Sequence, residues 1–148
     1  MTRHKTMTFM LAGLALPLMI LAFHHAQTVS DGPQSIVWDQ EACAECHMLI
    51  SEQGFAAELQ TTGGQTLDFD DPACLMTYVA RQHPGVHAIY FHDSQSARWL
   101  RSDQASFVRS AQSPMGRALE AVSSSRPGAL SYAEALREIE QAGPIEGK

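Results

Sequence analysis

The amino-acid sequence predicts an α+β fold made of two small related units, each with short antiparallel strands and one helix, behind an N-terminal membrane segment. Three features support this prediction: a charge-free apolar run near the N-terminus, short apolar runs around a Gly-Gly turn, and two segments that begin with strong helix-capping signals. The chain has 148 residues, of which 45% are hydrophobic and 18% are charged. This size and composition suit one domain.

The N-terminal segment determines the predicted compartment. Arg3 and Lys5 precede the 17 uncharged residues 7–23, which is the pattern of a signal peptide or a short signal anchor. A helix of this length reaches ~26 Å, slightly less than the ~30 Å hydrocarbon core of a bilayer. Cleavage after Ala26 would require small residues at the first and third positions before the cut, but the third position is His24. This poor cleavage site favours an uncleaved anchor.

These features set the predicted domain boundaries. Residues 1–26 are the signal anchor or signal peptide, residues 27–36 are a polar, flexible spacer, and residues 37–148 form the functional domain. Because positive residues stay on the cytoplasmic side, we expect the domain on the periplasmic side of the bacterial inner membrane. It would be anchored there, or secreted to the periplasm if the segment is cleaved.

The first unit is predicted to begin with strands. Met48–Ile50 and Phe55–Leu59 are apolar enough for strands, and the chain returns through Gln65–Phe69 after a turn at 61–64. Two apolar runs around a Gly-Gly turn indicate a β-hairpin. A helix then starts at Asp71, because an Asp N-cap followed by Pro at the first helical position is a strong start signal.

The second unit is predicted to contain several short strands and a final helix. Ser131 and Glu134 form a capping box at the start of a helix over 131–141. The segment 117–122 fits either a strand or a short helix. The remaining strand candidates are Val86–Phe91, which completes the first unit, and Ala97–Leu100 and Ser106–Val108 in the second.

Charge excludes one class of partner. The formal net charge is -6, and the only lysines are Lys5 and Lys148. The arginines are scattered and form no basic patch with interleaved aromatic residues, so nucleic acid is excluded as a partner.

The cysteines carry the candidate chemistry. Cys43, Cys46 and His47 form C-x-x-C-H, the attachment motif of haem c. Extended by one residue to Met48, the same stretch is C-x-x-C-x-M, a thiolate-thioether set suited to Cu(I). Cys74 is the third cysteine, and this odd number in an exported chain leaves one thiol unpaired or reserves the set for a metal.

Spacing supports the copper interpretation. Residues two apart on a strand share a face, so Cys46 and Met48 are the first candidate ligands, with Cys43 close by through the C-x-x-C turn. His47 and Cys74 are possible secondary ligands. Cys74 falls in the first turn of the predicted helix, where the helix dipole favours a thiolate. Asp70 and Asp71 are interpreted as helix-capping residues.

Two other classes compete with this interpretation. An electron-transfer c-type cytochrome would use Cys43, Cys46 and His47 for haem c, with Met115 in the Ser113–Gly116 loop as the distal ligand. It leaves Cys74 without a role. A thiol-disulfide oxidoreductase would place C-x-x-C at a helix start within a βαβ unit, whereas a strand is predicted to follow the motif here.

The chain contains a set of ordered motifs: Cys43-x-x-Cys46-x-Met48-x-Ile50, Phe69-Asp-Asp-Pro-x-Cys74-Leu-x-x-Tyr78, His92-Asp93 followed by Trp99, Ala105-x-Phe-Val108, and Ser113-Pro-Met-Gly116. In this order and spacing, the motifs make the chain resemble the NosL family of exported copper chaperones, which serve the assembly of nitrous oxide reductase.

The resemblance implies an α+β fold of two related units and Cu(I) binding at the C-x-x-C-x-M region, with Met115 as a soft ligand from the second unit. It implies a protein that catalyses no reaction. The expected partner is a copper-accepting metalloenzyme, such as nitrous oxide reductase, or its membrane assembly complex. The chain departs from the family in having His47 where Gly is common and in lacking a lipid-bearing cysteine.

Overall fold

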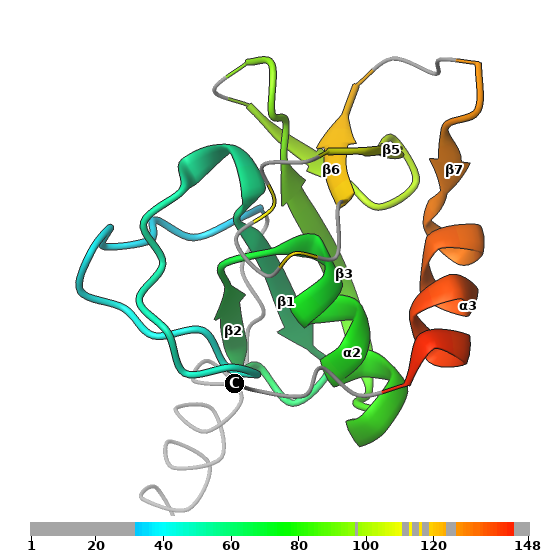
Figure 1. The fold of residues 1–148 in the computed structure, drawn as a ribbon. Coiled ribbons are helices and arrows are strands. Elements are labelled where there is room, and N and C mark those ends of the chain that lie inside the picture. Colours follow the sequence, from blue (N-terminus) through cyan, green and yellow to red (C-terminus); the bar gives the residue numbers. More distant parts are fainter. Residues whose placement is uncertain are drawn as a thin grey trace, which may run out of the picture.

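The computed structural model describes residues 32–96, 98–110, 113, 116, 119–123 and 127–143. Within these ranges the elements are η1 (Gln53–Phe55), β1 (Ala57–Thr61), β2 (Thr66–Phe69), α2 (Pro72–Gln82), β3 (Val86–His92), β4 (Trp99–Arg101), β5 (Ser106–Arg109), β6 (Leu119–Val122), β7 (Leu130–Ser131) and α3 (Tyr132–Ala142). Figure 1 shows their arrangement.

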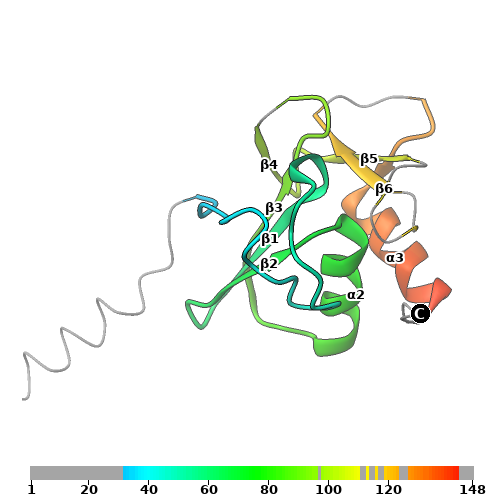
Figure 2. The ribbon, with the colours of Figure 1, turned by 60° about the vertical axis from the view of Figure 1, so that its left-hand side comes forward.

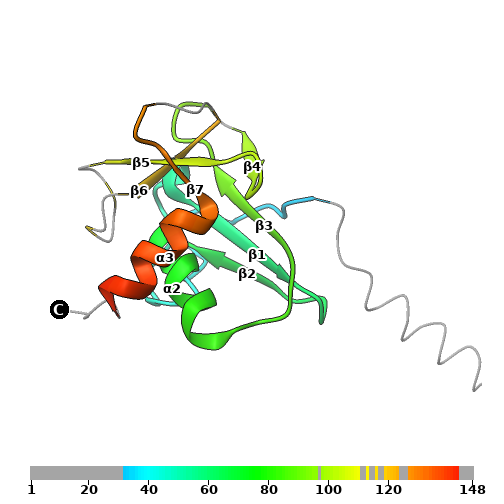
Figure 3. The ribbon, with the colours of Figure 1, turned by 90° about the vertical axis from the view of Figure 1, so that its right-hand side faces the viewer.

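The strands form two antiparallel sheets, and the two helices lie beside each other. One sheet has the strand order β2-β1-β3-β4 and the other β6-β5-β7. Helix α2 covers one face of the first sheet, and α3 packs against α2, β5 and β7 (Figure 3). The predicted α+β class with short antiparallel strands and two helices is therefore confirmed, while the relationship between the two units stays a prediction.

The predicted hairpin is formed by β1 and β2. Their register runs from Ala57 opposite Phe69 to Gln60 opposite Thr66, and β1 also pairs with β3. As the inner strand, β1 is buried along its whole length. Since side chains alternate between faces, Ala57 and Leu59 join the core under α2, whereas Glu58 and Gln60 point to the opposite face.

The chain from Gly32 lies across that opposite face (Figure 2). The backbone N–H of Gln34 donates to Glu58 at 2.6 Å, and the Gln60 amide donates to the carbonyl of Gly32, also at 2.6 Å. Ile36 is buried in the core. The last part of the predicted spacer thus contacts the sheet, and the boundary at residue 36 stays a prediction.

Helix α2 follows the predicted signals. The Asp71 carboxylate accepts from the N–H of Ala73 at 2.7 Å, and Pro72 occupies the first turn. At the other end His83 adopts the left-handed conformation, with φ 47°, and its N–H donates to Val79. Pro84 then prevents continuation.

The second unit also agrees with the predicted elements. The capping box of Ser131 and Glu134 is present at the start of α3. The segment 117–122, interpreted as a strand or a short helix, contains strand β6. Strands β4 and β5 lie within one to two residues of their predicted positions, and the short strand β7 was not predicted.

The strand predicted at Met48–Ile50 is wrong. The segment forms one isolated bridge, Ala42 opposite Leu49. His47 adopts a left-handed φ of 62°, which interrupts an extended course directly before Met48. The N-terminal segment 1–31 lies outside the described residues, and within the described ranges no helix is long and apolar enough to cross a membrane.

Candidate metal centre

A tight turn positions the first two cysteines. The N–H of His47 donates to the carbonyl of Cys43 at 3.0 Å, and the N–H of Cys43 donates to the carbonyl of Met48 at 2.8 Å. The N–H of Ala44 donates to the carbonyl of Asp68 at 2.9 Å, which fixes this turn against the end of β2. The C-x-x-C loop therefore sits where β2 passes into α2.

The third cysteine reaches the same place from the other side. Cys74 is in the first turn of α2, and the Asp71 cap holds the start of that helix. Asp71 also accepts a hydrogen bond from the hydroxyl of Ser113, which lies 42 residues further along the chain. The start of α2 is thus fixed by contacts from both units.

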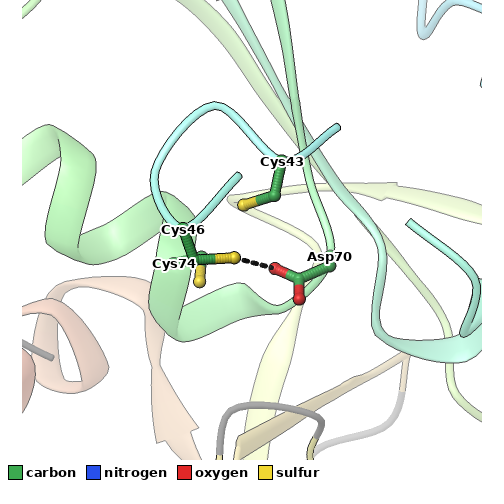
Figure 4. A group of neighbouring side chains, drawn as sticks. All are labelled: Cys43, Cys46, Asp70 and Cys74. Atoms are coloured by element: carbon green, nitrogen blue, oxygen red, sulfur yellow. Dashed lines mark hydrogen bonds between the residues drawn. The ribbon is translucent and has the colours of Figure 1, made fainter. Parts of the chain in front are cut away.

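These elements assemble one cluster of four ligand atoms. The sulfur atoms of Cys43, Cys46 and Cys74 and a carboxylate oxygen of Asp70 all lie within 4.8 Å of one another (Figure 4). The Cys46 thiol donates to Asp70 Oδ1 at 3.4 Å. Cys43 and Cys74 are completely buried, whereas Cys46 is partly exposed and none of the three forms a disulfide. We call this set the thiol cluster.

The three thiols differ in acidity. The pKa of Cys43 is lowered, first because the Cys74 thiol donates to its sulfur and then because backbone N–H groups of Cys46 and Asp70 point at it. Burial raises the pKa of Cys46 to about 12, and the hydrogen bond and charge interaction with the neighbouring Cys43 add to this rise. Cys43 is therefore the most acidic of the three thiols.

Cys74 does not behave as predicted. The expectation was that the helix dipole would favour its thiolate. Instead the pKa of Cys74 is raised, first because its proton is held in the hydrogen bond to Cys43 and second because it is buried. Within this cluster a direct hydrogen bond outweighs the field of the helix terminus.

An ion pair ties the turn to the far end of α2. Arg81 donates to Glu45 at 2.6 Å, with 54% of the Arg81 side chain exposed but only 8% of the Glu45 side chain. Glu45 lies between the two cysteines of the turn. Arg81 follows Cys74 by seven residues, or two helical turns, so both side chains leave α2 on the same side.

The predicted ligands are placed as follows. The structure brings Cys43, Cys46 and Cys74 together. Met48 and His47 are exposed, and Cys46 and Met48 do not lie on a common strand. Met115 lies outside the described residues.

The sequence did not predict Asp70 as a site residue. It was interpreted as a helix cap, but Asp71 alone provides that cap. Asp70 is 2% exposed, so a carboxylate directed at thiols in this position requires a reason other than solubility. The available sequence signal was its position directly before the Asp71 cap, which places Asp70 at the helix start that also carries Cys74.

A separate hollow of about 310 Å³ lies between the C-terminal halves of the two helices. Thr77, Ala80, Arg81, His83, Ile139, Glu140 and Gly143 line it. This lining contains no sulfur, so the candidate metal centre is the thiol cluster.

Together, the fold and the site define an α+β protein with a buried three-cysteine cluster open at one thiol. The sequence pattern of the NosL family matches residues 34–136, so the chain belongs to the NosL family. No curated protein matches the chain. A crystal structure of the copper chaperone NosL from Shewanella denitrificans is similar to it with a TM-score of 0.57 and 23% identity, covering 74% of this chain and 88% of that one.

Proposed function

We propose that this protein is an extracytoplasmic Cu(I) chaperone that takes up one ion at the thiol cluster and passes it to a copper-accepting metalloenzyme. The observation that carries the proposal is the approach of three cysteine sulfurs to within 4.8 Å of one another. Thiolate ligands select soft Cu(I) over hard cations. Cu(I) is the cargo here, and no catalytic step is proposed.

The arrangement suits transfer as well as binding. Cys43 and Cys74 are buried, so an incoming ligand from a partner meets Cys46 first. Replacement of one sulfur ligand at a time at this accessible thiol would pass the ion on without releasing it into solution. Asp70 beside Cys46 adds an oxygen that binds Cu(I) weakly.

Methionines complete the proposed ligand set. Met48 follows Cys46 by two residues and its side chain is 46% exposed, so it is available to an ion at Cys46. The proposal for Met115 is supported by Ser113, two residues earlier, whose hydroxyl donates to Asp71. That contact places Ser113 itself at the start of α2. His47 remains a secondary candidate.

The acceptor is proposed to be nitrous oxide reductase or its membrane assembly complex. Membership of the NosL family supports this choice, as does the similarity to a protein described as a copper chaperone. The predicted N-terminal anchor would hold the domain at the periplasmic face of the membrane and raise its effective concentration near the assembly complex.

The structure disfavours the two competing classes. Haem attachment needs two thiols directed toward a planar ring beside His47, but the sulfur of Cys43 is buried against Cys74. A disulfide oxidoreductase places its C-x-x-C at a helix start, whereas Cys43 and Cys46 lie in a turn and Cys74 occupies the helix start. Zn(II) is the remaining rival, since three Cys and one Asp can form a tetrahedral site.

A competition titration tests the proposal. The purified protein under reducing conditions is titrated with Cu(I) against a chromogenic chelator, and we expect one ion per chain. Cys74→Ala should weaken Cu(I) binding by about 100-fold or more, because it removes one of three strong ligands. Cys46→Ser combined with Met48→Leu should abolish tight binding.

The control is Ile139→Val, which removes a methylene from the buried face of α3 and should leave copper affinity unchanged. Equal losses in Cys74→Ala and Ile139→Val would mean that copper affinity follows stability rather than ligation. Displacement of bound Cu(I) by a modest excess of Zn(II), or a covalently bound haem in the purified protein, would contradict the proposed cargo.

A further inference from the structure

Exposed apolar side chains gather on the segment that carries the C-x-x-C turn of the thiol cluster. Four large apolar residues in the described part of the chain are exposed: Val37 and Met48 at 46%, Leu49 at 55% and Val86 at 43%. Three of them, Val37, Met48 and Leu49, belong to the segment that carries the C-x-x-C turn, and we call these three the apolar rim. Exposed apolar residues that cluster in this way mark interaction sites.

Backbone hydrogen bonds bring the two ends of this segment together. The N–H of Asp39 donates to the carbonyl of Ile50 at 3.0 Å, and Ala42 pairs with Leu49. Val37 precedes Asp39 by two residues, and Leu49 precedes Ile50. The rim therefore comes from two neighbouring stretches of chain and flanks the turn that holds the accessible Cys46.

The chain segment that carries the rim is rich in acidic residues and contains no Lys or Arg. Between Gly32 and Ala80 the chain has no Lys or Arg. The same range contains eight acidic residues: Asp39, Glu41, Glu45, Glu52, Glu58, Asp68, Asp70 and Asp71. Asp39 and Glu52 are exposed next to the Leu49–Ile50 stretch. Arg81, the first cation after this range, is already paired with Glu45.

We propose that the apolar rim is the docking surface for a protein partner whose contact face has an apolar centre surrounded by Lys and Arg. Apolar contact with the rim would supply affinity, and the exposed acidic charge of Asp39 and Glu52 would speed encounter and select the orientation. The proposal rests on the proposed function for what is transferred, because docking here places a partner's ligands beside Cys46.

Charge argues against a second copy of this chain as the occupant. Two identical rims face to face would bring Asp39 and Glu52 near their equivalents, and like charges across an interface are repulsive. A bilayer with anionic headgroups is disfavoured for the same reason. A basic protein surface satisfies both the apolar and the charged part of this face.

Two synthetic peptides provide the probe. They share one leucine- and methionine-containing core, flanked by lysines in one peptide and by glutamates in the other, and each is labelled for fluorescence anisotropy. The full-length protein is used both with and without Cu(I). We expect the basic peptide to bind at least about tenfold more tightly than the acidic one, and this preference should be lost in about 0.5 M salt.

Matched variants locate the surface. Leu49→Lys and Val86→Lys both place one positive charge at an exposed apolar position, and Val86 begins β3, at the end of that strand away from the cluster. We expect Leu49→Lys to weaken binding of the basic peptide by about tenfold and Val86→Lys by less than about twofold. Copper affinity should be unchanged in both, because neither residue is a proposed ligand.

Three results would overturn the proposal. The first is an equal effect of Leu49→Lys and Val86→Lys on peptide binding, and the second is equal binding of the basic and acidic peptides. The third is a wild-type dimer in sedimentation that Leu49→Lys dissociates, because that result would assign the rim to a second copy of the chain. Failure of the proposed function looks different. In that case the wild-type protein takes up no Cu(I), while the peptide preference and its loss in Leu49→Lys persist.

Discussion

Helices α2 and α3 have the same length but begin in opposite environments. Each spans 11 residues and starts with a side-chain cap. The start of α2 is inside the protein, where six consecutive residues, 72–77, are buried. The start of α3 is at the surface, with Ser131 and Glu134 exposed and only Ala135 and Ile139 buried.

The two helix starts therefore differ in role: the start of α3 only caps its helix, whereas the start of α2 also holds buried reactive side chains. An exposed cap such as Ser131 needs no reason beyond helix formation. Transferring a carboxylate or a thiol from water into the protein interior costs free energy. Asp71 and Cys74 are nevertheless both 0% exposed. The buried start of α2 therefore holds Cys74 in position for the thiol cluster. Matched variants in the two helices can test this conclusion.

The caps should give the largest contrast in stability. Asp71→Ala removes the cap and also leaves the buried Ser113 hydroxyl without an acceptor, so we expect a loss of about 2–3 kcal/mol. Ser131→Ala should cost about 1 kcal/mol, because water can replace the lost contact. Urea denaturation of the metal-free protein measures both values.

Asp71→Asn is the control for the cap itself, since Asn caps helices as well as Asp does. It should recover much of the loss seen in Asp71→Ala. A Ser131→Ala variant that loses as much stability as Asp71→Ala would remove the distinction between the two helix starts.

The ion pairs of the two helices should differ less. Arg81→Ala leaves the nearly buried carboxylate of Glu45 unpaired, and we expect it to cost about 1 kcal/mol after allowance for the half-exposed arginine. Arg109→Ala breaks the exposed pair with Glu138 on α3 and should cost less than about 0.5 kcal/mol.

Copper binding sharpens this second contrast. Arg81→Ala should weaken Cu(I) binding several-fold in the chelator competition, because Glu45 lies within the turn between Cys43 and Cys46. Arg109→Ala should have no effect on it. Identical copper affinities in the two variants would show that the Arg81–Glu45 pair does not position the turn.

The smallest effect concerns pH at the start of α3. Hydrogen bonds from the backbone N–H and the hydroxyl of Ser131 lower the pKa of Glu134. The stabilisation is therefore present above the ordinary glutamate pKa and is lost as the pH falls through the lowered value. We expect Glu134→Gln to lower the thermal midpoint slightly at pH 7 and not at pH 3, whereas a pH-independent effect would exclude the charged capping box.

Local signals explain what the sequence predicted well. The Asp71-Pro72 start, the Ser131 capping box and the Gly63-Gly64 turn each act within a few residues, and all three appear in the structure. The Met48–Ile50 strand failed because its course depends on the left-handed His47 and on hydrogen bonds to residues 39–43.

The candidate site was predictable only in part, for the same reason. The thiols of Cys43 and Cys46 are neighbours in sequence, so their proximity follows from the motif. The inclusion of Cys74 and Asp70 depends on the contact of Ala44 with Asp68, which joins the turn to the end of β2. No sequence pattern within the C-x-x-C turn or within β2 predicts that contact.

The thiol cluster draws its sulfurs from two stretches of chain that meet only after β2 has paired and α2 has formed. A chain that has not yet folded therefore offers only the C-x-x-C pair as a preformed set of neighbouring thiols and would hold copper poorly. Under the proposed function, folding has to precede copper loading, and bound copper would in turn stabilise the folded protein against opening.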